Sequence, residues 1–312
     1  METIALLLKS HAGDLEYARR LLASFEQFNS ENLTLFCVVP DADFGMFAEL
    51  GGAHVKLIAE GEALGRHLVD GPVGSLSQGY ANQEIVKLSF WELGLTSNYF
   101  CVDSDAVFIR PFGSKDFMRD PSTPYSVLVE DNELKVEPEY FRQNWQGRES
   151  LIRKIMDIVE LDDPIMRTSH GHQIVSGLVL QDFKSRFLQP RQWTYADAIE
   201  YSPYEFSWYA MWLQKSQVIA IHQREPLVKV FHSESQHLEY ILRGVTSADI
   251  ARGYLAVVVN SNYSRDLGVV SIADSKPEAI APYLSYAELL DVSRTKVRDT
   301  WRRRSGRRGS AE

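Results

Sequence analysis

The sequence predicts an α/β protein in which a mostly parallel, Rossmann-like central sheet is flanked by helices. Short apolar runs alternate with amphipathic stretches over the first hundred residues, and Gly94 ends one helical pattern just before another apolar run. This alternation is typical of parallel strands joined by helical crossovers. The predicted strands here are 4–8, 33–39, 54–58 and 99–109. The predicted helices are 14–28, 44–50 and 82–93, with a long irregular segment at 61–79.

The pattern after Pro111 is less regular. Further strands are predicted at 125–130, 174–181, 217–222, 227–231 and 254–259, and further helices at 139–160 and 205–213. Gly177 falls inside one of these strands, where a glycine often marks the close approach of a ligand or of a second backbone. We expect one compact domain at 1–240, an extension at 241–300 packed on it, and a disordered basic tail at 301–312.

Composition indicates a soluble globular protein. The chain has 312 residues, 45% of them hydrophobic and 24% charged, which is ordinary for a globular domain. No apolar run approaches the roughly 20 residues of a membrane span, and the first residues lack the basic start of a signal peptide. Cys37 and Cys101 both lie in predicted strands, so we expect buried thiols, a reducing compartment and a cytoplasmic location.

The charge is unevenly distributed. The net charge is −9, although the last eleven residues contribute five arginines and one glutamate. An acidic body argues against a nucleic-acid groove, so we expect no nucleic-acid partner. The basic tail could make peripheral contact with anionic lipid at the inner membrane face, or it could simply be solvated.

The candidate site begins at 99–109, where an apolar run enters the turn Asp103-Ser-Asp105 and another leaves it. Side chains two apart on an extended segment share a face. Two neighbouring carboxylates are the hard ligands that Mg²⁺ or Mn²⁺ prefers. A second triplet, Asp41-Ala-Asp43, precedes a predicted helix, and we expect its carboxylates to cap that helix.

Four other features remain open between a functional and a structural role. His232 ends an apolar strand and could bind a metal. Glu205 lies among aromatic residues and could be a base, or it could be an ordinary carboxylate at a helix start. Lys87 could meet a phosphate, although a solvated helix face is the more common role of such a lysine. The pair His170-x-His172 is a weak zinc pattern because no third soft ligand lies nearby.

Aromatic residues at 193–212 could form a platform for sugar rings or a hydrophobic core. The usual glycine-rich signatures of dinucleotide enzymes, P-loop enzymes and serine hydrolases do not occur in the sequence.

The order of these parts resembles the nucleotide-sugar-dependent glycosyltransferases of the GT-A fold, in particular small bacterial proteins grouped as a domain of unknown function. The resemblance covers roughly residues 1 to 240. Its matching stretches are Lys9-Ser-His-Ala-Gly-Asp14, Gln83-Glu-Ile-Val-Lys-Leu88, Asp103-Ser-Asp-Ala-Val-Phe-Ile-Arg-Pro111, and Ser176-Gly177 together with the histidine that follows Val228-Lys-Val-Phe231. Many proteins of this fold have asparagine where Val175 stands, so this chain departs from the pattern there.

The resemblance implies a role for each matching residue. The residues expected to contact a nucleoside-diphosphate sugar are Lys9, Ser10, Asp14, Gln83, Lys87, Asp103, Ser176 and Gly177. The expected ligands of Mn²⁺ or Mg²⁺ are Asp103, Asp105 and His232. The expected catalytic residues are Asp105 and, as the carboxylate on the acceptor side, Glu205.

These expectations describe a metal-dependent, hexosyltransferase-like enzyme that moves a sugar to a glycan, a lipid-linked acceptor or another hydroxyl group. The departure of the nucleoside diphosphate could invert or retain the anomeric configuration. Two alternatives stay open: another metal-dependent phosphoryl or nucleotidyl enzyme, which would also use paired carboxylates, and a non-catalytic carbohydrate-binding module.

Overall fold

The structure is a computed structural model that describes residues 2–129, 138–166, 168–169, 171–232, 236–237, 239–240 and 243–260, with isolated positions at 290, 293–294 and 297. Most of the predicted 241–300 extension and the whole 301–312 tail lie outside the described residues. Tertiary contacts divide the chain into two compact units. The first comprises Met1–Leu22, Asn29–Ser104 and Phe112–Pro226, and the second comprises Ala23–Phe28, Asp105–Pro111 and the chain from Leu227 onward.

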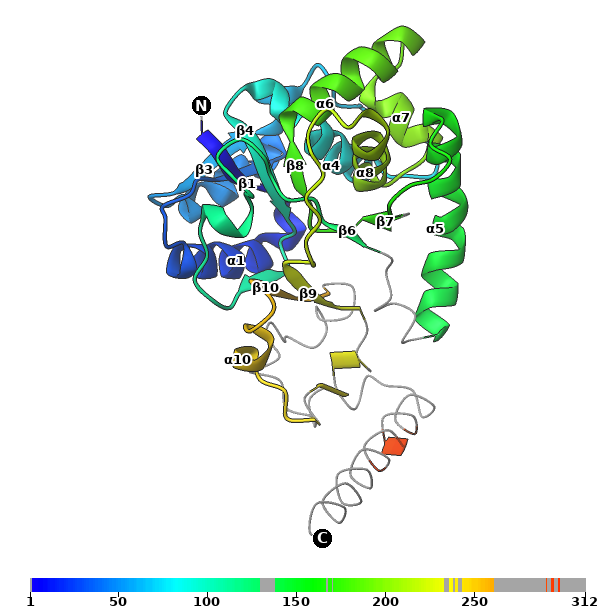
Figure 1. Cartoon of the computed structure of the whole chain (residues 1–312). Coiled ribbons are helices and arrows are strands. Elements are labelled where there is room, and N and C mark those ends of the chain that lie inside the picture. Colours follow the sequence, from blue (N-terminus) through cyan, green and yellow to red (C-terminus); the bar gives the residue numbers. More distant parts are fainter. Residues whose placement is uncertain are drawn as a thin grey trace. The chain divides into compact units, whose positions relative to one another are not determined.

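A five-stranded sheet with the order β3-β2-β1-β4-β8 forms the centre of the first unit (Figure 1). Its strands are β1 Glu2–Lys9, β2 Leu35–Val39, β3 Val55–Ala59, β4 Thr96–Val102 and β8 Ile174–Ser176. The first four run parallel, and β8 pairs antiparallel with β4. The predicted α/β class and the mostly parallel sheet are therefore confirmed.

The helices of the chain carry the crossovers and cover the sheet. Their bounds are α1 Leu15–Phe28, α2 Phe44–Phe47, α3 Glu60–Leu64, α4 Gln78–Ser89, α5 Pro138–Val159, α6 Gly177–Phe183, α7 Tyr195–Tyr201, α8 Glu205–Ser216 and α10 Ser247–Ile250. In Figure 1, α4, α6 and α8 lie together on one side of the sheet. Gly94 ends the helical segment after α4 in the left-handed conformation, as predicted. None of the described helices combines the length and apolarity that crossing a bilayer requires.

The main core of the first unit lies between one face of the sheet and these helices. Alternate strand residues, such as Leu7, Val38 and Cys101, share this face. Most of the aromatic residues of 193–212 belong to the same core, and Trp208 and Tyr209 are almost completely buried. These residues fulfil the core role that was predicted as one alternative, whereas Trp193 and Tyr201 are only partly buried against the core. Cys37 and Cys101 are free and buried, as expected.

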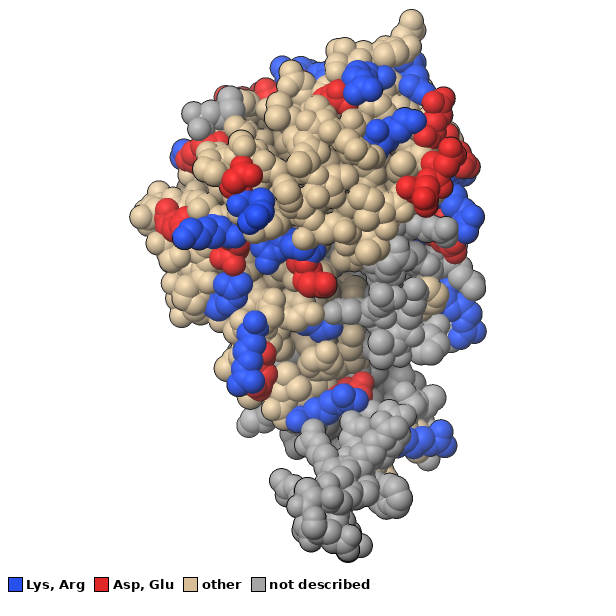
Figure 2. Space-filling view, viewed as in Figure 1, with Lys and Arg blue, Asp and Glu red and all other residues tan. Residues whose placement is uncertain are grey.

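Acidic and basic side chains are interspersed over the face of the molecule in Figure 2.

The first Asp-x-Asp triplet uses its carboxylates differently from the prediction. Asp41 accepts a hydrogen bond from the amide of Gly61 in α3 (2.8 Å), and Asp43 accepts one from Ala12 before α1 (2.8 Å). The predicted capping of α2 by its own Asp43 is wrong, because no side-chain cap forms there. The two carboxylates instead bind the first turns of two neighbouring helical segments.

One predicted strand is absent from the described structure, and another is shortened. Residues 217–222 form no strand, and the predicted strand 174–181 ends at Ser176, where α6 begins. The run after Gly177 is helical because Val179, Leu180 and Phe183 fall on one buried face, with helical spacing. The close backbone approach expected at Gly177 is confirmed, since an added Cβ would lie 3.0 Å from the Ser97 carbonyl oxygen.

We expect Gly177→Ala to lower the free energy of unfolding by about 1 to 3 kcal/mol, because the β4 backbone beside it must move. Gly79→Ala is the matched control. Gly79 is exposed in α4 and an added Cβ would meet nothing within 4 Å, so this variant should be about 0.5 to 1 kcal/mol more stable. Urea unfolding of both variants measures the two effects, and equal midpoints would contradict the close approach.

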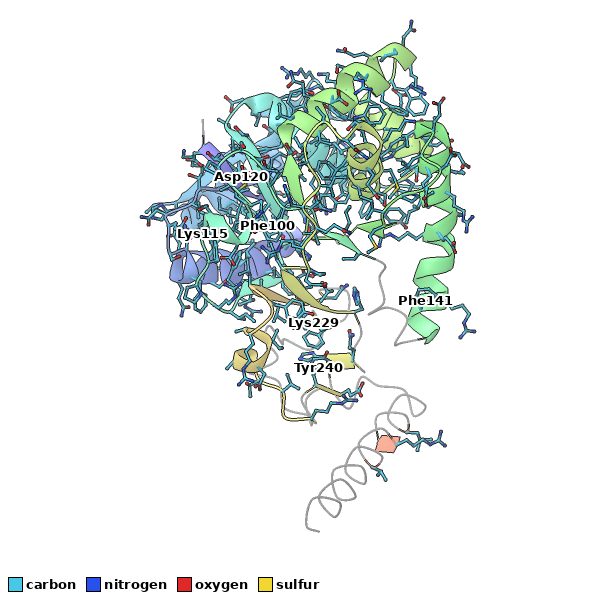
Figure 3. The ribbon with its side chains drawn as sticks, viewed as in Figure 1. Phe100, Lys115, Asp120, Phe141, Lys229 and Tyr240 are labelled. Atoms are coloured by element: carbon cyan, nitrogen blue, oxygen red, sulfur yellow. The ribbon has the colours of Figure 1, made fainter. Side chains whose placement is uncertain are left out.

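The second unit has its own three-stranded sheet, with the order β5-β10-β9. Its strands are β5 Ala106–Phe108, β9 Val228–Phe231 and β10 Ala256–Val259. Strand β10 pairs antiparallel with β5 and parallel with β9. A small core around Phe231 and Val257 holds the unit together. Lys229 and Tyr240, labelled in Figure 3, belong to this second unit, and the Lys229 Nζ lies 5.4 Å from the centre of the Tyr240 ring.

Candidate functional site

The carboxyl ends of β1 and β4 form the most polar edge of the first unit. The strand order reverses its direction at β1, since β2 lies on one side of it and β4 on the other. Ligands of open α/β sheets bind outside the carboxyl ends of the strands at such a point. Ser10 follows β1 and Ser104 follows β4, and the Ser104 hydroxyl donates a hydrogen bond to the Ser10 hydroxyl (3.0 Å). The two segments that would flank a ligand are thus linked directly.

Lys9 is the last residue of β1 and is buried. Its ammonium group lies 2.8 Å from Glu60 Oε2 and donates to the carbonyl oxygen of Ser10 (3.0 Å). The side chain therefore ties the ends of β1 and β3 together at this edge.

The buried Lys87 forms ion pairs with two carboxylates, those of Asp103 and Glu205. The Nζ atom of Lys87, on α4, lies 3.2 Å from Asp103 Oδ1 and 2.9 Å from Glu205 Oε1. Burial alone would lower the pKa of Lys87, but Asp103 and Glu205 raise it well above its ordinary value, so the side chain is a cation. The solvated-face interpretation of Lys87 is wrong: its side chain is 5% exposed.

The two carboxylates differ in their access to solvent. The side chain of Asp103 is 38% exposed, whereas that of Glu205 is 8% exposed. Glu205 is the first residue of α8, which is the position that the structural alternative predicted for it. Of this pair, Asp103 is therefore the carboxylate that a ligand can reach directly, and Glu205 balances the charge of Lys87 from the protein side.

Glu84 completes the cluster, and the sequence analysis missed it. It lies one helical turn before Lys87 on α4, and its Oε2 atom accepts hydrogen bonds from the amides of Tyr204 (2.8 Å) and Glu205 (3.0 Å). Burial, and then the nearby Glu205 carboxylate, raise the pKa of Glu84 to about 8. The available signal was its spacing of three residues from Lys87, which places both side chains on one face of the helix.

The raised pKa of Glu84 gives stability a pH dependence. Between about pH 4.5 and pH 8 the unfolded chain loses the proton that the folded protein keeps, so folding stability falls as pH rises, by at most about 1.4 kcal/mol per pH unit. Glu84→Gln mimics the protonated side chain and has no proton to lose. We expect its urea midpoint to exceed that of the wild type increasingly from about pH 5 to about pH 8 and by a constant amount above that, whereas parallel curves over this range would contradict the assignment.

His172 faces the same aspartate. It is buried next to the carboxyl end of β4, and its Nε2 atom lies 3.7 Å from Asp103 Oδ2. Burial lowers the pKa of His172 despite the nearby carboxylate, which favours a neutral imidazole. Its predicted partner in the zinc pattern, His170, lies outside the described residues.

The structure does not bring all of the predicted ligand-contacting residues to this edge. Ser176 pairs with Asn98 of β4, five residues before Asp103 and therefore about 16 Å from it along the strand. Ser176 is buried, and its amide donates to the Tyr209 hydroxyl (2.9 Å). Gly177 continues away from the edge into α6.

The other two predicted contact residues lie on helical segments. Asp14 is in the turn before α1, 3.4 Å from the His11 ring, and Gln83 is half-buried on α4.

Asp105 and His232 both lie at one end of the sheet of the second unit. Asp105 immediately precedes β5 and His232 immediately follows β9. Because β5 runs antiparallel to β10 and β9 runs parallel to it, the start of β5 and the end of β9 lie at the same end of the sheet. One strand separates them, so their backbones are about 10 Å apart.

A carboxylate and an imidazole suit Mn²⁺, with open positions left for phosphate oxygens. Within the part of the chain that the structure describes, no group of three or more His, Cys, Asp or Glu side chains is arranged to hold a metal. A metal bound by Asp105 and His232 would have to take its remaining ligands from a bound molecule.

Comparison with solved structures identifies the class of fold. The apo structure of WbbM, a bifunctional glycosyltransferase, aligns with a TM-score of 0.51 at 11% identity, covering 94% of this chain and 51% of that one. This chain thus spans about half the length of the WbbM structure. The crystal structure of mouse xyloside xylosyltransferase 1 in its apo form aligns with a TM-score of 0.46 at 12% identity, covering 83% of this chain and 98% of that one. The α/β fold is one that glycosyltransferase structures share.

The chain belongs to the family DUF6492, a family of unknown function whose model matches residues 3–239. No curated protein matches it.

Proposed function

We propose that the protein is a metal-dependent glycosyltransferase that moves a sugar from a nucleoside-diphosphate sugar to a hydroxyl group of a glycan or other acceptor. The observation that carries this proposal is the solvent-accessible Asp103, fixed by the buried Lys87 at the reversal of the strand order. This edge is where α/β sheets bind nucleotides. The fold shared with the WbbM glycosyltransferase structure is consistent with it.

Asp103 would bind the nucleotide part of the donor. Its carboxylate can accept hydrogen bonds from ribose hydroxyls, because Lys87 and His172 hold it from the protein side. Ser10 and Ser104 are buried at the same strand ends, and their mutual hydrogen bond would position the two segments that flank the phosphates.

Asp105 and His232 would hold the divalent metal, since they lie at one end of their sheet and combine oxygen and nitrogen donors. Only one residue separates Asp105 from Asp103 in the sequence. When bound, the metal supplies Lewis-acid stabilisation of the negative charge that develops on the departing diphosphate.

Glu205 would act chiefly as a positioning residue, because its carboxylate is almost inaccessible and is paired with Lys87. A retaining reaction, in which the leaving phosphate accepts the acceptor proton, would need no further carboxylate. An inverting reaction would need a base that reaches the acceptor hydroxyl group.

Thermal unfolding with a panel of nucleotide sugars tests the proposal. The panel consists of UDP, GDP and CDP sugars and a CMP sugar, each with and without Mn²⁺. We expect one nucleoside-diphosphate sugar to raise the melting temperature only when Mn²⁺ is present, and we expect slow metal-dependent release of its nucleoside diphosphate. Nucleoside triphosphates are tested in the same way, and stabilisation by them alone would favour a nucleotidyl enzyme. The absence of any nucleotide effect would favour a carbohydrate-binding module.

A further inference from the structure

A pocket with both polar and apolar lining lies within the first unit, beside the α4 segment. It has a volume of about 370 Å³ and is lined by residues of three segments: the loop after α3, the turns after α6, and the start of α7. Its polar and aromatic lining includes Arg66, His67, Lys184, Gln189, Trp193 and Tyr195. Glu92, which pairs with two of the lining residues, is five residues beyond Lys87 on the same helical segment, about 8 Å along the axis. The lining contains none of the residues that form the cluster around Asp103, so the pocket is separate from that cluster.

A buried carboxylate fixes the basic groups of this pocket. Oε2 of Glu92 lies 2.7 Å from Lys184 Nζ and 3.1 Å from Arg66 Nη2, and its Oε1 accepts a hydrogen bond from the Tyr195 hydroxyl (2.8 Å). Burial alone would raise the pKa of Glu92, but the hydrogen bonds from Lys184 and Tyr195 hold it below its ordinary value. Glu92 is therefore ionised and sets the positions of two cations.

One positive charge remains after this pairing. Arg66 and Lys184 together carry two positive charges, and Glu92 balances one of them. His67 accepts a hydrogen bond from Arg66 Nε (3.0 Å), and burial lowers its pKa, so it contributes a neutral imidazole. The Arg66 guanidinium can still donate hydrogen bonds from Nη1, and the Lys184 ammonium group can donate from N–H groups other than the one bonded to Glu92. An anion in the pocket would meet cations that are already oriented, which reduces the entropy cost of binding.

The pocket is also preformed on its loop side. The amide of Val69 donates to Asn82 Oδ1 (2.9 Å), and the Asn82 amide group donates back to the Val69 carbonyl oxygen (3.1 Å). This double hydrogen bond holds the loop against α4. On the other side, the half-buried Trp193 packs on Phe187 and Tyr201, so its ring is held in place.

We propose that this pocket binds an anionic monosaccharide, a single sugar ring that carries a phosphate or carboxylate group. The fixed cations would bind the anionic group, Trp193 would pack against the ring, and Gln189 and Thr194 would meet its hydroxyl groups. The volume suits a ligand of about one ring. The site is distinct from the proposed donor site and does not depend on it.

Calorimetric titration of the full chain without metal tests this proposal, using glucose 6-phosphate, glucuronate, glucose, inorganic phosphate and UMP. We expect glucose 6-phosphate or glucuronate to bind at least about tenfold more tightly than glucose or phosphate, because ring and anion both contribute. The tighter of the two identifies the anionic group. Binding of neither, equal binding of inorganic phosphate, or tighter binding of UMP would overturn the assignment.

Two arginines of equal exposure provide the matched variants. Arg66 is 63% exposed in the pocket, and Arg186 is 62% exposed and paired with Asp182 outside it. Arg66→Ala should weaken binding at least about tenfold, whereas Arg186→Ala should leave it unchanged. Lys184→Gln provides a second test of the same cation pair. Asp105→Ala should retain this binding even if it loses the donor response, so failure of one site is distinguishable from failure of the other.

Discussion

Lys87→Met is expected to lower the free energy of unfolding by about 3 to 5 kcal/mol, the usual cost of removing one partner of a buried ion pair. Methionine has a similar length and keeps the apolar packing of the lysine stem. Without the ammonium group, Glu205 and Asp103 lose the cation that balances them in a poorly solvated site. Urea unfolding at pH 7 measures the loss.

Two further variants make this prediction specific. Lys215→Met removes an exposed lysine that donates only to the Glu160 carbonyl oxygen, and it should cost less than about 1 kcal/mol. Lys87→Met combined with Glu205→Gln should recover part of the lost stability, because the second change removes the uncompensated charge. An unchanged urea midpoint for Lys87→Met would show that the cluster is solvated rather than buried.

The sheet could be predicted because its apolar strands are short and its crossovers are amphipathic. Each of the four parallel strands overlaps a predicted apolar run. The edge strand β8 was harder to predict. The run Ile174–Gln181 is mostly apolar, and such a run suits a buried strand as well as a buried helix. Its conversion to α6 at Gly177 depends on contact with the β4 backbone, which the local sequence does not encode.

Lys87, Asp103 and Glu205 were each predicted as site residues, but the burial of Lys87 and its pairing with the two carboxylates were not. A charged residue on a helix is normally expected on a solvated face, but residues Glu84 to Ser89 of α4 are all buried. This helix lies in the core between the sheet and α8, so its polar residues must find partners inside the protein. Asp103 is sixteen residues from Lys87 in the sequence, so their pairing is a tertiary contact. The strand-end position of Asp103 and the helix-start position of Glu205 could be predicted, but not the contacts of either with Lys87.

The second large effect is expected from Asp105→Ala, which should lower metal-dependent turnover of the donor by about 10³-fold, or roughly 4 kcal/mol of transition-state stabilisation. Asp105 begins β5 and lies at the same sheet end as His232. If both are metal ligands, His232→Ala should weaken Mn²⁺ binding in a titration as Asp105→Ala does. Full turnover by folded Asp105→Ala would refute the metal assignment.

Asp41→Ala is the matched control, since Asp41 belongs to the other Asp-x-Asp triplet. Its carboxylate binds the Gly61 amide, so its loss should cost about 1 kcal/mol of stability and leave Mn²⁺ binding unchanged. The comparison separates two explanations of an activity loss. A fall in metal-dependent turnover in both variants would point to a general effect of removing an acidic side chain. A fall in Asp105→Ala alone would show that turnover requires the carboxylate at that strand end. Because the two triplets share a pattern and differ in their positions, the contrast tests position rather than charge.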